Sequence, residues 1–149
     1  MALVYITLDQ ALETHQKTVA VSGGGALGVF NIGQLGSVLQ NIQNDDYYPT
    51  FEDKLTHLFF CANKFHCFED GNKRIAISLG AQFLLLNGYV FAASRFMREM
   101  ENISYHVAAS RIGRDLLRDI ITELVNEDEL SESTRLRILD AITHVRTNT

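Results

Sequence analysis

The sequence predicts an all-α protein, a helical bundle built around one central buried helix at about residues 73–88. Apolar residues recur at helical spacing along most of the chain, and capping or stop residues separate these stretches. No strand-like alternation of useful length and no internal repeat is present. With 149 residues, 46% of them hydrophobic, the chain is long enough for one ordinary core and too apolar to be disordered. We therefore expect a single domain over residues 1–149.

The first helix is expected over about residues 8–18. Thr7 and Gln10 form a capping-box pattern at its start. His15 lies on this helix and is expected to be a surface or half-buried histidine. The glycines of residues 22–25 lack the lysine and the spacing of a phosphate-binding loop, and they indicate a flexible turn between helices.

Two further helices follow. Asn31 and Gln34 are a second capping pair, and they predict a short helix that ends near Gln43. The next helix opens at residues 50–53, and its apolar stripe predicts a core-facing surface that leads straight to His66. The stripe consists of Phe51, Leu55, Leu58, Phe59, Ala62 and Phe65.

Between these helices, residues 44–49 are polar and aromatic and include the single proline. We expect a loop there, or a short hairpin near residues 45–50. Tyr47 and Tyr48 have two interpretations. They cover a functional loop or a docking edge, or they pack on the following helix.

The central helix contains the most apolar part of the chain, residues 75–86. A helix that is apolar on every side is expected to be buried on every side. Asn87 and Gly88 supply its C-terminal stop, so the apolar run is too short to span a membrane.

The last third of the chain predicts three more helices. Residues 89–91 are expected to form a brief strand or an extended linker. Ser94 is then expected to cap a helix to about residue 109, with Phe96, Met97, Met100, Ile103 and Val107 facing inward and His106 in a structural role. A helix over 114–125, an acidic turn at 126–129 and a helix capped near Ser131 or Ser133 complete the chain. Leu136, Ile138, Leu139 and Ile142 are the expected apolar face of that final helix.

The charge balance narrows the function. The net charge is −5 and the sequence pI about 5.5, which disfavours direct nucleic-acid binding. The N-terminus has no signal-peptide pattern, so we expect a cytoplasmic protein with no membrane partner. Cys61 and Cys67 are expected to be reduced, partly buried thiols, as is usual in a cytosolic protein. A zinc site with His66 is not expected, because no second pair of zinc ligands occurs at suitable spacing.

The residues suited to catalysis are concentrated in residues 66–74, which lead into the first turn of the central helix. A helix N-terminus attracts anions, and the two cations Lys73 and Arg74 add positive charge to it. These residue types suit phosphoryl or nucleotidyl transfer. The expected roles are His66 as general base, Asp70 as Mg²⁺ ligand, and Gly71, Asn72, Lys73 and Arg74 as phosphate-binding residues, with Phe68 as the apolar anchor of the loop.

A simpler interpretation is that this segment is only a polar turn, with Asp70 or Asn72 as the helix N-cap. That interpretation leaves two cations unexplained at a helix end where the dipole disfavours them. It also leaves unexplained the histidine just before them. Such an unfavourable local choice indicates a functional site.

The segment His66-Cys67-Phe68-Glu69-Asp70-Gly71-Asn72-Lys73-Arg74 resembles the core motif of the Fic/Doc family at all seven of its specified positions. The likeness extends to about residues 4–125, with residues 48–54 and 86–89 among the similar stretches. The helix from about residue 130 then looks like an addition to a Fic-like helical bundle. Lys73 replaces the glycine of the AMP-transferring branch, and Ile77 replaces its second arginine. Both features are shared with the death-on-curing toxins of that family.

The resemblance implies a kinase that uses ATP and Mg²⁺ to phosphorylate a hydroxyl, expected to be a threonine of elongation factor Tu, and thereby arrests translation. The self-inhibitory pattern Ser/Thr-x-x-x-Glu-Gly/Asn was not found at Ser22, Thr122 or Ser131, so a separate antitoxin is expected to supply the inhibitory segment. Three alternatives stay open: AMP transfer, a catalytically silent module that binds an antitoxin or peptide, and an RNA-cleaving toxin. The acidic charge balance disfavours the RNA-cleaving toxin.

Overall fold

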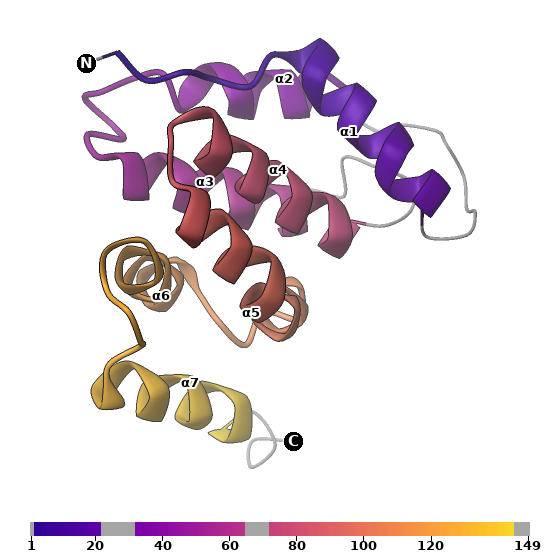
Figure 1. The fold of residues 1–149 in the computed structure, drawn as a ribbon. Helices are drawn as coiled ribbons and strands as arrows, with labels where there is room; N and C mark the ends of the chain where they lie inside the picture. The colour runs from indigo at the N-terminus through magenta and orange to yellow at the C-terminus, as the bar shows by residue number, and fades with distance from the viewer. Residues whose placement is uncertain (1, 22–31, 65–71, 145–149) are drawn as a thin grey trace.

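The fold is all-α, as predicted. The computed structural model describes residues 2–21, 32–64 and 72–144 (Figure 1). Within these ranges there are seven helices and no strand: α1 (Leu8–Val21), α2 (Ile32–Asn41), α3 (Phe51–Lys64), α4 (Asn72–Leu86), α5 (Val90–Ala108), α6 (Arg114–Asn126) and α7 (Glu132–His144). None of these helices is long and apolar enough to cross a lipid bilayer.

Helix α4 is the centre of the bundle and packs against α1, α3 and α5 (Figure 1). Ile75, Leu79 and Phe83 on this helix are fully buried. The prediction that it is buried on every side is wrong at Leu85, which is 53% exposed because it lies in the last turn, where the bundle no longer surrounds the helix. Gly88 ends the helix as predicted. Its φ of +88° is the left-handed conformation that glycine adopts without strain.

The capping box at the start of α1 is confirmed. The Gln10 amide donates to Oγ1 of Thr7 at 3.1 Å, and the Thr7 amide donates to Oε1 of Gln10 at 3.0 Å. His15 was expected at the surface or half-buried, but it is buried, with 1% exposure. The reason is that α1 lies along α4, where Oγ1 of Thr14 donates to Oε1 of Gln82 at 2.8 Å. The glycine turn at residues 22–25 and the cap at Asn31 lie outside the described residues.

Residues 44–50 form a turn-rich loop, and the hairpin alternative is wrong. The side-chain oxygen of Asn44 accepts hydrogen bonds from the amides of Asp46, at 2.9 Å, and Tyr47, at 3.3 Å, which closes tight turns in place of a strand ladder. Tyr48 packs on the next helix, with its ring centroid 4.5 Å from that of His57. Tyr47 is exposed.

The expected strand or linker at residues 89–91 is wrong, and so is the expected cap at Ser94. Helix α5 begins at Val90, and Tyr89 is its N-cap residue without a side-chain capping bond. Tyr89 stacks on Phe51 with centroids 4.8 Å apart, and this contact together with the reversal at Gly88 lets the helix start five residues early. Met97 was expected to face inward but is 59% exposed, because the buried face of α5 follows Phe96, Met100, Ile103 and Val107 at helical spacing and position 97 is one residue out of that register.

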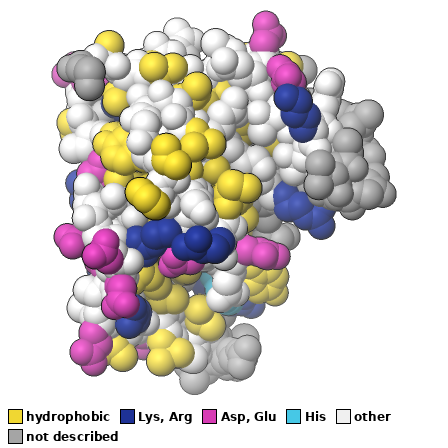
Figure 2. All heavy atoms as spheres, viewed as in Figure 1, with side chains coloured by type: hydrophobic (Ala, Val, Ile, Leu, Met, Phe, Trp, Pro, Cys, Tyr) yellow, Lys and Arg dark blue, Asp and Glu magenta, His cyan; other side chains and the backbone are white. Residues whose placement is uncertain are grey.

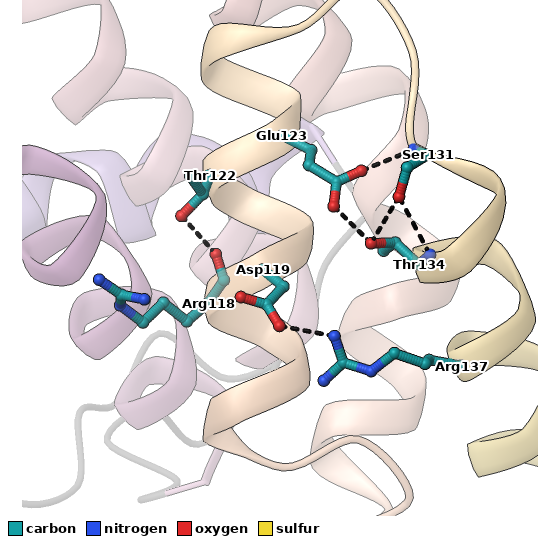
Figure 3. A network of polar contacts seen from close by, with 7 residues as sticks. All are labelled: Arg118, Asp119, Thr122, Glu123, Ser131, Thr134 and Arg137. Carbon is teal, nitrogen blue, oxygen red and sulfur yellow. Dashed lines mark hydrogen bonds and ion pairs between the residues drawn. The ribbon is translucent and has the colours of Figure 1, made fainter.

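Helix α7 lies at the edge of the bundle (Figure 1). Among the described helices, α6 is the one against which it packs extensively. Ser131 is its cap, since Oγ of Ser131 accepts the Thr134 amide at 3.1 Å. Glu123 on α6 accepts hydrogen bonds from the Ser131 amide, at 2.6 Å, and from the Thr134 hydroxyl, and Arg137 forms an ion pair with Asp119 (Figure 3). The amide hydrogen bond from Ser131, then that from Thr134, lowers the pKa of the Glu123 carboxyl.

The expected apolar face of α7 is only partly confirmed. Ile138 and Ile142 are partly buried, whereas Leu136 and Leu139 are more than half exposed. A helix that packs against a single helix buries only a narrow stripe of its own side chains. In α7 that stripe also contains the polar residues that contact α6.

Candidate active site

The N-terminus of α4 is held in a fixed direction by burial of the turn that follows it. Ile75 and Ala76 are fully buried within the core. The ring of Phe96 on α5 lies so close to Gly80 that a Cβ atom at that position would overlap it. Because the hydrophobic core and α5 both restrain α4 closely, the free amide groups of its first turn have a defined orientation.

The electrostatics of this first turn favour an anion. It contains no acidic residue, whereas helices usually place carboxylates there. Lys73 and Arg74 occupy its second and third positions, and Arg74 is exposed. Helix dipole and side-chain charge therefore have the same sign at this end, which suits phosphate groups.

The structure describes only part of the predicted site. Arg74 is described completely, and Asn72 and Lys73 are described as the first helical residues of α4. His66, Phe68, Asp70 and Gly71 lie outside the described residues, as do Phe65 and Cys67. The roles predicted for these residues, and for the side chains of Asn72 and Lys73, stay predictions. Cys61 is buried, and the expectation that Cys61 and Cys67 are reduced thiols stays a prediction.

The last turn of α3 is fastened to α5 by a buried polar pair that sequence reasoning missed. Oγ of Ser104 donates to Oδ1 of Asn63 at 2.5 Å, and Nδ2 of Asn63 donates to the Phe59 carbonyl at 2.9 Å. Asn63 and Ser104 are 1% and 0% exposed. The position of Asn63, four residues after Phe59 on the buried stripe, is the sequence signal that could have identified it. The pair fixes the chain at the point where it approaches His66.

A second missed cluster lies around His57, six residues before Asn63 on α3. Nη1 of Arg114, the first residue of α6, lies 3.0 Å from Nδ1 of His57, and the hydroxyl of Tyr48 lies 3.3 Å from Nε2. Nδ1 therefore accepts a hydrogen bond, which requires a neutral imidazole. Burial, and next the charge of Arg114, lower the pKa of His57 from 6.5 to about 4. The cluster thus joins α3, α6 and the 44–50 loop around an uncharged histidine.

Buried Lys54 is the third feature that the sequence analysis did not anticipate. Its Nζ donates to the carbonyl of Ile42 and to Oδ1 of Asp45, each at 2.7 Å, while its side chain is 1% exposed. Lys54 follows Phe51 by three residues and precedes Leu55, so its place on the apolar stripe was the available signal. These contacts hold the start of the 44–50 loop against α3.

Within the described residues no group of three or more His, Cys, Asp or Glu side chains is placed to hold a metal ion. Asp70, the predicted Mg²⁺ ligand, is not among those residues.

Comparison with known proteins gives one result. A family model described as "Fic/DOC family" matches residues 5–84, which include the whole of the 66–74 motif. No curated protein matches the chain. No solved structure matches it either.

Proposed function

The chain belongs to the Fic/Doc family, and on that premise we propose that it is a kinase that transfers the γ-phosphate of ATP to a protein hydroxyl. Members of this family are typically transferases that move AMP or phosphate onto other molecules. The observation on which the proposal rests is the first turn of α4, which combines two adjacent cations, no acidic residue and an orientation fixed by burial.

Two positions favour phosphate transfer over AMP transfer. Lys73 stands where AMP-transferring members have glycine, which puts a long cation into the phosphate-binding turn. Ile77, where such members have a second arginine, is partly buried against the core. Position 77 therefore packs with the core and contributes no phosphate-binding charge.

The remaining residues of the motif have defined roles in this proposal. His66 accepts the proton of the attacking hydroxyl, and Gly71, Asn72, Lys73 and Arg74 hold the phosphates. Asp70 would hold Mg²⁺, which neutralises phosphate charge when it is bound. The free amides and the exposed Arg74 of the acid-free first turn fit phosphate oxygens.

The proposed acceptor is a threonine of a translation factor, elongation factor Tu in the first instance, and the proposed regulator is a separate antitoxin. An antitoxin is proposed because the chain lacks an inhibitory motif of its own at Thr122 and Asn126. They have the spacing of an inhibitory pattern but lack its glutamate, and Nδ2 of Asn126 is bonded to the Thr122 carbonyl within α6, at 2.9 Å.

The test is transfer of label from ATP to purified elongation factor Tu, with the label on the α-phosphate in one reaction and on the γ-phosphate in another. We expect label from the γ-position only, and loss of that label in His66→Ala. Label from the α-position would show AMP transfer instead. In a parallel arm, Lys73→Gly tests whether the cation selects between the two reactions. Absence of transfer from both positions, with both this substrate and whole-cell protein as acceptors, would contradict the enzymatic proposal.

A further inference from the structure

Three cations near the junction of α3, α5 and α6 have only neutral partners among the described residues. We call Lys64, Arg111 and Arg114 the basic corner. Their polar contacts are with a hydroxyl, a cysteine sulfur and two imidazoles. Nζ of Lys64 contacts Oγ of Ser110, and Nη1 of Arg111 lies 3.4 Å from Nδ1 of His106. Arg114 places Nη1 3.0 Å from Nδ1 of His57 and Nη2 3.9 Å from Sγ of Cys61. None of these contacts neutralises the positive charge, because an imidazole that accepts a hydrogen bond is uncharged.

Most of the other cations in the described part of the protein are paired with a carboxylate, whereas Arg74 and Arg98, which are not part of the corner, have no such partner there. Six cations lie within ion-pair distance of a carboxylate: Lys17, Lys54, Arg95, Arg118, Arg135 and Arg137. On the face shown in Figure 2, positive side chains lie beside negative ones. Asp115, the acidic residue of the first turn of α6, is exposed and forms no ion pair with a described cation. The basic corner therefore stands out as positive in a chain of net charge −5.

Aromatic rings hold these cations in place. The ring of Phe60 has Nζ of Lys64 at 5.9 Å and Cζ of Arg114 at 4.3 Å from its centroid. Cζ of Arg111 lies 5.7 Å from the centroid of Tyr105, which is half exposed. Cation–π contacts restrict long side chains without cancelling their charge, so part of the entropic cost of binding an anion is already met.

We propose that the basic corner is a docking surface for an acidic segment of a partner protein. The charge of the corner complements carboxylates, and the half-exposed ring of Tyr105 suits an apolar residue between them. A short acidic segment is small enough for all of it to lie near the positive charges of the basic corner. An extended nucleic acid would also approach other parts of a chain whose net charge is −5, and at physiological salt the repulsion from each negative group acts over roughly 8 Å. The proposal does not depend on the transferase activity.

The test measures binding of a fluorescent Glu-rich peptide to the full chain by anisotropy, without ATP. A Lys-rich peptide of equal length and a single-stranded oligonucleotide of equal charge are the comparison probes. The test variant is Lys64→Gln with Arg111→Gln, which leaves the Arg114–His57 contact in place. The matched control is Arg98→Gln, since Arg98 is exposed on α5, contacts Ser94 at 3.4 Å and forms no ion pair with a described carboxylate.

We expect the Glu-rich peptide alone to bind, with affinity lower by about tenfold in the double variant, as for two exposed ion pairs. Arg98→Gln should leave the affinity unchanged, and a variant with Lys64→Arg and Arg111→Lys should retain it, which guards against a folding defect as the cause. No binding of the Glu-rich peptide, or equal weakening in Arg98→Gln, would overturn the proposal. Equal or tighter binding of the oligonucleotide, with the same dependence on the basic corner, would replace the protein partner with a nucleic acid.

Discussion

Arg114 and His57 are 57 positions apart in the chain, yet a guanidinium nitrogen of the arginine lies 3.0 Å from Nδ1 of the imidazole. An arginine beside a histidine is normally a repulsive pair when both are charged. Here the pair is compatible because the histidine is neutral, and the neutral histidine also contacts Tyr48 in the preceding loop. The imidazole of His57 therefore connects α3, α6 and the 44–50 loop, and because it must be neutral to do so, the packing of these segments depends on pH.

The first prediction is that this junction weakens in acid. The folded-state pKa of His57 is lowered from 6.5 to about 4, so between these values the unfolded chain binds more protons than the folded one. The contribution of His57 to stability is therefore fully present above pH 6.5 and is lost as the pH falls toward 4, by at most about 3 kcal/mol. Urea unfolding at a series of pH values measures it. His57→Gln should show a smaller loss over this window, and an unchanged pH dependence in that variant would contradict the assignment.

The second prediction concerns the contact between α4 and α5. Gly80→Ala places a methyl group against the buried ring of Phe96, which itself packs edge-on against Phe59 at 5.2 Å. We expect a loss of about 1–3 kcal/mol in the free energy of unfolding, because the close-packed neighbours cannot move aside. Gly33→Ala is the matched control. Gly33 lies in α2 with nothing near its missing Cβ, so alanine should stabilise the chain by up to about 1 kcal/mol. Thermal unfolding followed by circular dichroism compares the two, and equal effects would refute the packing argument.

The third prediction concerns the buried pair before the motif. Ser104→Ala removes the donor to the side-chain oxygen of Asn63, and the loss of a buried partner should cost about 1–3 kcal/mol of stability. Transfer activity should also fall at temperatures where the variant is folded, since the end of α3 leads to His66. Ser104→Thr keeps the hydroxyl and should recover part of both. Full activity in the alanine variant would mean that this pair has no positioning role.

The fourth prediction separates activity from stability at Arg74. The side chain is exposed, so Arg74→Ala should leave the unfolding midpoint nearly unchanged. If Arg74 holds transferred phosphate, the rate constant for transfer should fall by roughly 10²-fold or more, the usual cost of removing one preorganised charge-stabilising group. Steady-state kinetics with the acceptor protein provide the measurement. Alanine at Arg135, which is exposed on α7 and pairs with Glu129, is the control and should leave the rate unaffected.

Local signals predicted the helices well. The capping box of Thr7 and Gln10, the cap at Ser131 and the stop at Gly88 all depend on interactions among neighbouring residues, and each is observed. The start of α5 was misplaced because Tyr89 needs no side-chain cap when its ring stacks on Phe51. That contact joins residues far apart in the chain, so no local sequence pattern predicts it.

The sequence by itself determined the all-α class, the order of the helices, the central position of α4 and the motif that places the chain in its family. Period and spacing encode these properties, because helix capping and amphipathic burial act over a few residues. Only the tertiary structure decided which polar side chains are buried and with what partners. Lys54, Asn63 and His57 are buried, and no sequence pattern identifies the partners that each of them needs. Their burial is stable because Asp45, Ser104 and Arg114 reach them from other segments, and a buried polar group persists only where the fold brings it a partner.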